Sequence, residues 1–75
     1  MEISLNHLRP GKMAQVVAVI ECEGISDRLR GFGLQPGITL CCCERSENGQ
    51  ETVLQIGGSC IRLQTRDLEK IRVSV

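Results

Sequence analysis

Short apolar stretches and short stretches of alternating apolar and polar residues follow one another along the chain, separated by turn-forming residues. This pattern is typical of strands joined by turns. The most apolar stretch, residues 13–20, is rich in β-branched residues and too short for an independent helix, so we expect a central strand there. We expect further strands at residues 38–44, 52–56, 60–63 and 71–75.

Residues 24–34 have a different period. Three apolar residues recur at spacings of four and three and predict one apolar stripe on a short helix: Ile25, Leu29 and Phe32. Ser26 is the expected N-cap, and Gly33 is expected in the left-handed conformation that follows a helix. Leu34 would then pack against Leu29, as a Schellman ending requires.

The remaining turn-forming residues complete the pattern of a mostly β fold. Pro36-Gly37 predicts a type II turn, Asn48-Gly49 a reversal and Gly57-Gly58 a hairpin turn. Residues 65–70 are expected to form one helical turn capped by Thr65. About five strands with one or two short helices imply a small, partly open β-barrel. No linker or repeat interrupts residues 1–75, so we expect a single domain.

Composition narrows the function. Phe32 is the one aromatic residue, so the core is thin and a large ligand cavity is not expected. Nine basic and nine acidic residues give a formal net charge of zero, which argues against nucleic-acid binding. We expect no membrane insertion, because no apolar run reaches the roughly 18 residues that a span needs. The first residues do not resemble a secretory signal, so we expect a cytoplasmic protein.

Catalytic machinery is not evident in the sequence. His7 is the only histidine, and it lies near the N-terminus, where a solvated side chain is the usual outcome. The carboxylates are dispersed, and no phosphate-binding loop motif is present. We therefore expect a protein that is not an enzyme and that needs no cofactor.

The five cysteines offer the sharpest alternative. Three are consecutive, Cys41 to Cys43, and neighbouring residues of a regular strand point to opposite faces. Cys41 and Cys43 would share a face, where Cys22, Cys60 or His7 could complete a metal site. The C-x-x-C knuckles that usual zinc sites present are absent, so reduced thiols acting as small hydrophobes are the preferred interpretation. A metal-binding or redox module stays open as an alternative function.

Binding of another protein is the function that these observations favour. A set of charged residues could form an electrostatic rim around an apolar patch: Arg28, Arg30, Arg62, Arg66, Lys70 and Arg72. The predicted protein-binding residues lie on and just after the predicted helix: Ile25, Arg28, Leu29, Phe32 and Leu34. In a thin domain such a helix often leaves part of its apolar surface available to a partner.

The order of motifs resembles the FeoA family, the ferrous iron transport protein A domains. The resemblance rests on Leu8-x-Pro10-Gly11, on Gly33-Leu34-x-Pro36-Gly37 with Arg28-Leu29 before it, and on the closing Asp67-Leu68-x-x-Ile71-x-Val73. It covers essentially the whole chain. Two features depart from the family pattern: the three cysteines in the strand after Pro36-Gly37, and Glu47-Asn48-Gly49-Gln50 at the hairpin.

The resemblance implies an SH3-like β-barrel in the bacterial cytoplasm. It also implies a partner, the FeoB-type membrane transporter of ferrous iron, on whose cytoplasmic part the domain would dock. It supplies no catalytic or metal-binding residues. The family is also similar to the C-terminal domain of metal-dependent repressors, so a detached regulatory domain is a further alternative.

Overall fold

The computed structural model describes residues 1–20 and 25–75, without the side chains of Ile25 and Ser26. The described elements are strands β1 (Glu2–Ser4), β2 (Met13–Val19), β3 (Thr39–Arg45), β4 (Glu51–Ile56), β5 (Ser59–Gln64) and β6 (Ile71–Ser74), the α-helix α1 (Ile25–Gly31), and the 3-10 helices η1 (Leu5–His7) and η2 (Thr65–Lys70).

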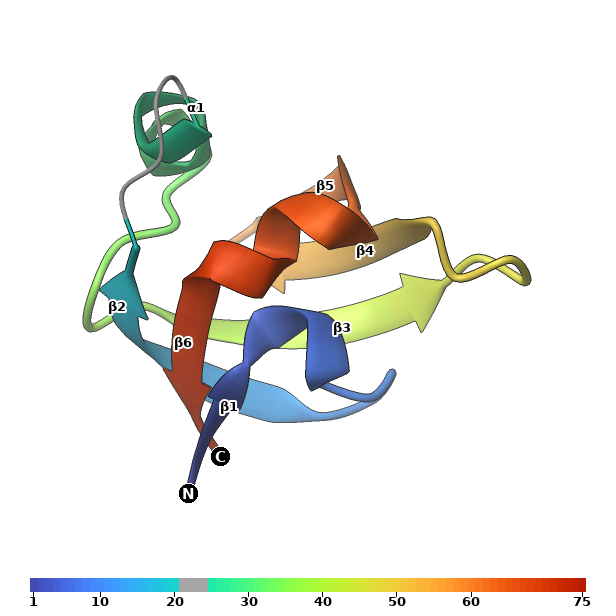
Figure 1. Cartoon of the computed structure of the whole chain (residues 1–75), viewed down its shortest axis with the longest axis horizontal. Coiled ribbons are helices and arrows are strands. Elements are labelled where there is room, and N and C mark those ends of the chain that lie inside the picture. Colours follow the sequence, from blue (N-terminus) through green and yellow to red (C-terminus); the bar gives the residue numbers. More distant parts are fainter. Residues whose placement is uncertain (21–24) are drawn as a thin grey trace.

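All six strands form one antiparallel sheet in the order β1-β6-β2-β3-β4-β5. The sheet curls so that η1 and η2 fill its concave side, while α1 lies at one end (Figure 1). Strands β1 and β5 are the two edges of the sheet, so the barrel is partly open. The predicted mostly β fold is confirmed.

Strand β1 was not expected. It pairs with β6 at the other end of the sequence, with Ile3 opposite Val73. The pairing brings the chain ends together, because the Val75 amide donates to the Met1 carbonyl oxygen at 2.9 Å. Three residues of local pattern are too few to reveal a strand whose partner lies about 70 residues away along the chain.

The core is aliphatic. Side chains that alternate along the strands point inward, as the period of two requires, and the buried set is Leu5, Leu8, Ala14, Val16, Leu29, Leu34, Leu40, Cys42, Leu54, Leu63, Leu68, Ile71 and Val73. Cys42 is completely buried among them, and this burial raises the pKa of its thiol. Cys42 therefore acts as a small core hydrophobe.

Helix α1 ends as the sequence predicts. The Leu34 amide donates to the Leu29 carbonyl oxygen at 3.1 Å, and the Gly33 amide donates to the Arg30 carbonyl oxygen at 2.9 Å. These two bonds define a Schellman motif, with Gly33 at φ +91°. The start differs from the prediction: the helix begins at Ile25, so Ser26 lies inside its first turn and is not its N-cap.

Replacing Gly33 with alanine should destabilise the domain by about 1–2 kcal/mol, because an L-residue is strained in the left-handed region. The added Cβ would also lie 3.4 Å from Ile56 Cγ2. Urea denaturation measures the loss. The matched control is Gly31→Ala in the helix, where a Cβ meets no atom within 4 Å and should stabilise by about 0.5–1 kcal/mol. Equal stability of the two variants would contradict this role for Gly33.

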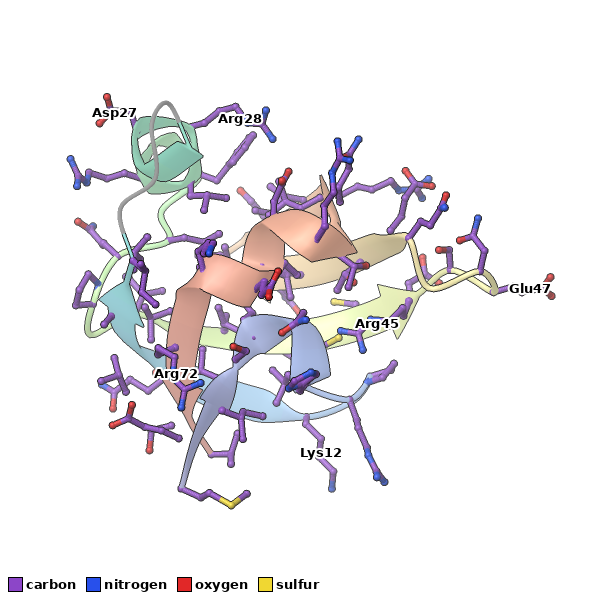
Figure 2. All side chains as sticks on the ribbon, viewed as in Figure 1. Lys12, Asp27, Arg28, Arg45, Glu47 and Arg72 are labelled. Carbon is purple, nitrogen blue, oxygen red and sulfur yellow. The ribbon has the colours of Figure 1, made fainter. Side chains whose placement is uncertain are left out.

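The predicted cap of η2 is wrong. The residue at the N-cap is Gln64, with no side-chain cap bond, and the Thr65 hydroxyl instead lies 2.7 Å from the buried Thr52 hydroxyl. Arg45 reaches the same cluster: its Nε donates to Thr52 Oγ1 at 3.0 Å and its Nη2 to the Leu8 carbonyl oxygen at 3.0 Å. Figure 2 shows Arg45 lying between the end of β3 and η1. The Thr65 hydroxyl therefore joins η2 to Thr52 of β4 and does not cap the 3-10 helix.

A candidate protein-binding groove beside helix α1

One ion pair links helix α1 to η2. Arg28 Nη2 lies 3.0 Å from Asp67 Oδ2, and the Asp67 side chain is only 15% exposed, whereas that of Arg28 is 61% exposed. Asp27 and Arg28 leave α1 on opposite sides (Figure 2). The pair therefore orients the Arg28 face of the helix toward η2, although a pair this exposed contributes little stability of its own.

An open groove lies between α1 and the β5–η2 segment. Its lining residues come from all three elements and from the helix end: Arg28, Phe32, Arg62, Leu63, Gln64, Arg66 and Asp67. Phe32 is 41% exposed, although it is the only aromatic side chain of the protein. Leu63, which is almost completely buried, joins the groove to the core. The groove thus offers one aromatic contact surface with apolar atoms beside it.

Positive charge surrounds this aromatic residue. Three arginines and one aspartate line the groove, which leaves a net charge of +2 in a protein whose formal net charge is zero. Arg62 and Arg66 are exposed, and guanidinium groups present a planar fork that suits carboxylates. An apolar contact within a basic rim is the arrangement expected of a surface that binds an acidic partner.

A second hollow adjoins the groove and shares Gln64 and Arg66 with it. Its other lining residues come from the β3–β4 turn, the start of β4 and the start of η2: Asn48, Gly49, Gln50, Glu51 and Thr65. It has no aromatic or large aliphatic lining residue. The groove beside α1 is therefore the stronger candidate, and the second hollow is a polar extension of it.

The predicted binding residues separate into two groups. Arg28 and Phe32 line the groove, whereas Leu29 and Leu34 are 0% and 1% exposed and belong to the core. The side chain of Ile25 lies outside the described residues. Leu29 and Leu34 therefore position the helix end, and Arg28 and Phe32 are available for contact.

The sequence pattern predicts that Arg62 and Arg66 belong to a charged rim, but it does not predict that they lie beside α1. The signal for Arg62 is the alternation in β5, where Leu63 is buried and Arg62 is exposed. That Arg62 approaches Phe32 depends on how α1 packs against the sheet, which no local pattern encodes.

The cysteines considered as metal ligands differ in their exposure. Cys41 is half-buried and its Sγ donates to the Cys42 carbonyl oxygen at 3.7 Å, while Cys43 and Cys60 are exposed. Among residues 1–20 and 25–75, no three histidine, cysteine, aspartate or glutamate side chains converge on a common point. Cys22 lies outside the described residues.

Comparison with known proteins gives a consistent result. A family model described as the FeoA domain matches residues 3–75. The solution structure of iron(II) transport protein A from Clostridium thermocellum has 27% identity and a TM-score of 0.91, covering 97% of this chain and 45% of that one. The crystal structure of FeoA from Stenotrophomonas maltophilia complexed with zinc, described as a procaryotic SH3 domain protein, has 21% identity and a TM-score of 0.84, covering 96% and 89%.

A longer protein contains the same fold. The crystal structure of IdeR from T. acidophilum has 21% identity and a TM-score of 0.87, covering 99% of this chain but only 34% of that one. At such identity the likeness shows the fold alone, which is the predicted SH3-like barrel. No curated protein matches the chain. Within the described residues, none of the helices has the length and apolar character that a membrane crossing requires.

Proposed function

The chain belongs to the FeoA family, and from this premise we propose that it docks on the cytoplasmic part of a FeoB-type ferrous iron transporter and modulates it. The family is associated with ferrous iron transport, and its members are non-catalytic accessory domains. A related protein, that of Stenotrophomonas maltophilia, is itself described as a candidate bacterial ferrous iron transport activating factor. Docking of this kind would place the chain in the cytoplasm.

The groove beside α1 is the observation that carries the proposal. An exposed aromatic side chain costs solvation free energy, and contact with a partner would remove that cost. Phe32 is the only such residue here, and it lies among Arg28, Arg62 and Arg66. The occupant we propose is an acidic segment of the transporter that carries an apolar side chain for Phe32.

The mechanism is a shift between states of the transporter. A bound module changes such an equilibrium only by the difference between its affinities for the two states. The groove would therefore bind one arrangement of the acidic segment more tightly than the other. No residue of the domain needs to take part in chemistry.

Isothermal titration calorimetry of the transporter's cytoplasmic domain with the full chain tests the proposal. The titration is done in the presence and in the absence of guanine nucleotide. We expect saturable binding, and we expect Phe32→Ala to weaken it about 30-fold, since a central aromatic contact contributes about 2 kcal/mol. The exposure of Phe32 means that this variant should keep its fold, which circular dichroism checks.

Met13→Ala is the matched control, because Met13 is also exposed and apolar but lies on β2, outside the lining of the groove. It should bind as the unchanged chain does. Absence of binding at high micromolar concentration in every nucleotide state would sink the proposed function. Binding that Phe32→Ala leaves intact would remove the groove from it.

A further inference from the structure

Strand β5 has one edge without a partner strand. It is the outermost strand on its side of the sheet, and among the described strands only β4 pairs with it (Figure 1). The pairing runs from Ser59 to Gln64, through all six residues of β5, without a register shift. The other edge strand, β1, has only three residues. An edge as regular as that of β5 presents backbone donors and acceptors that can pair with another chain.

The hydrogen bonds around β4 show which way the backbone of Gln64 points. In an antiparallel ladder, the N–H and C=O of one residue point to the same side of the strand, and the side alternates from residue to residue. The Glu51 carbonyl oxygen accepts from the Ser46 amide at 2.9 Å, on the side of β3. The adjacent Gln50 carbonyl oxygen accepts from the Thr65 amide at 2.8 Å, on the side of β5. Gln64 is opposite Glu51, so its amide points away from β4.

The same alternation extends along β5 and leads to the groove. Arg62 lies two residues before Gln64 in an unshifted ladder, so its N–H and C=O also face the open edge. The amides of Ile61 and Leu63 point to β4 instead. Both Arg62 and Gln64 line the groove beside α1. The groove therefore contains the open edge of β5 as well as an aromatic side chain and a basic rim.

The two faces of β5 differ at this edge. Arg62 is exposed on the outer face, whereas Leu63 is buried on the core face. The end of α1 lies beside the core face, because a Cβ at Gly33 would lie 3.4 Å from Cγ2 of Ile56, which packs against the core. Phe32, the residue before Gly33, lines the groove together with Leu63. A strand added to β5 would therefore meet Arg62 on one face and Phe32 on the other.

We propose that an extended acidic segment of the transporter's cytoplasmic domain adds to the open edge of β5 as a further strand of the sheet. This inference rests on the proposed function and specifies how the groove holds its partner. The segment carries an acidic side chain opposite Arg62, where opposite charges on one face stabilise a strand pair. Its neighbouring positions carry apolar side chains, because successive residues of a strand point to opposite faces and these would contact Leu63 and Phe32.

Charge favours such a segment over a second copy of this chain. Two β5 strands aligned antiparallel about their shared centre would place Arg62 directly opposite Arg62, and like charges in that position destabilise a strand pair. The lining of the groove carries a net charge of +2, which attracts an acidic segment and repels a second basic edge. The exposed arginine thus discourages self-association while it selects the partner.

Gln64→Pro tests strand addition by removing the N–H that faces the open edge. The backbone of Gln64 has φ −71° and ψ 130°, which proline adopts without strain, and the preceding residue is in a strand, as a residue before proline prefers. Gln64→Ala is the matched comparison, because it removes the same side chain and keeps the N–H. In calorimetric titration of the transporter's cytoplasmic domain, the proline variant should bind at least about 10-fold more weakly than the alanine variant. Circular dichroism checks that both variants fold.

Amide hydrogen exchange of the unchanged full chain, followed by nuclear magnetic resonance, gives a readout that needs no variant. Binding should slow exchange at Arg62 and Gln64, whereas the amides of Ile61 and Leu63 are already protected by β4. Binding with unchanged exchange at Arg62 and Gln64, or equal affinity of the two Gln64 variants, would overturn strand addition and leave the proposed function standing. Absence of any binding would overturn both. Protection that grows with the concentration of the chain alone would assign the edge to a second copy and overturn the proposed occupant.

Discussion

A chain in which Arg62 and Arg66 are both replaced by glutamate should lose affinity for the transporter's cytoplasmic domain by more than about 100-fold, or about 3 kcal/mol. The change turns a groove of net charge +2 into one of net charge −2 and sets like charges against an acidic partner. Arg28 is left unchanged because it pairs with Asp67. Calorimetric titration at two ionic strengths measures the effect. Added salt should reduce the difference in affinity between the unchanged chain and the double variant.

The matched control is Arg9→Glu with Lys12→Glu, which makes the same change in net charge away from the groove. Figure 2 shows Lys12 on the opposite side of the molecule from Arg28. This control should keep most of the affinity. A loss in the control equal to that in the groove variant would mean that net charge alone governs binding, and the groove would lose its place in the proposal.

Leu54→Ala should have the largest effect on stability. Leu54 is completely buried at the centre of β4, between Cys42 on β3 and Ile61 on β5. Truncating a buried leucine costs about 2–5 kcal/mol, whereas a domain of this size has a free energy of unfolding of roughly 4–11 kcal/mol. The variant would therefore lose a large share of the domain's free energy of unfolding.

Thermal and urea denaturation followed by circular dichroism measures this loss. The reference is Met13→Ala, where the side chain is 65% exposed and the change should stay within about 0.5 kcal/mol. A loss below about 1 kcal/mol for Leu54→Ala would show that the sheet can collapse around the missing atoms and that the core is less tightly packed than its burial indicates.

The separation of two contacting residues along the chain decides whether the sequence could predict their contact. The Schellman ending of α1 is set by residues within six positions, from Leu29 to Leu34, and the predicted positions of Gly33 and Leu34 are confirmed. The turn at Pro36-Gly37 was likewise predictable, since Gly37 has φ +95° and the Ile38 amide donates to the Gln35 carbonyl oxygen. Strand β1 and the Thr52–Thr65 contact depend on partners far along the chain, so local patterns missed them.

In the candidate site too, the local pattern was predictable and the tertiary packing was not. The helical period placed Leu29 and Phe32 on one stripe but could not tell that Leu29 is buried and Phe32 is exposed. That difference arises where the helix ends and the chain turns into the core at Leu34. Outside the site, the pairing of β3 with β4 shifts by one residue between Cys42 and Glu44, a β-bulge that alternation could not reveal because one extra residue changes the register without changing the composition.

The joined ends of the chain make the domain easy to rearrange within larger proteins. Met1 and Val75 are hydrogen-bonded to each other, and Figure 1 places both at the end of the molecule opposite α1. A domain whose termini adjoin tolerates circular permutation and insertion into a loop of another chain. It can therefore be appended, inserted or left free-standing while its groove still faces outward, and IdeR, in which the same fold occupies about a third of the chain, is one such arrangement.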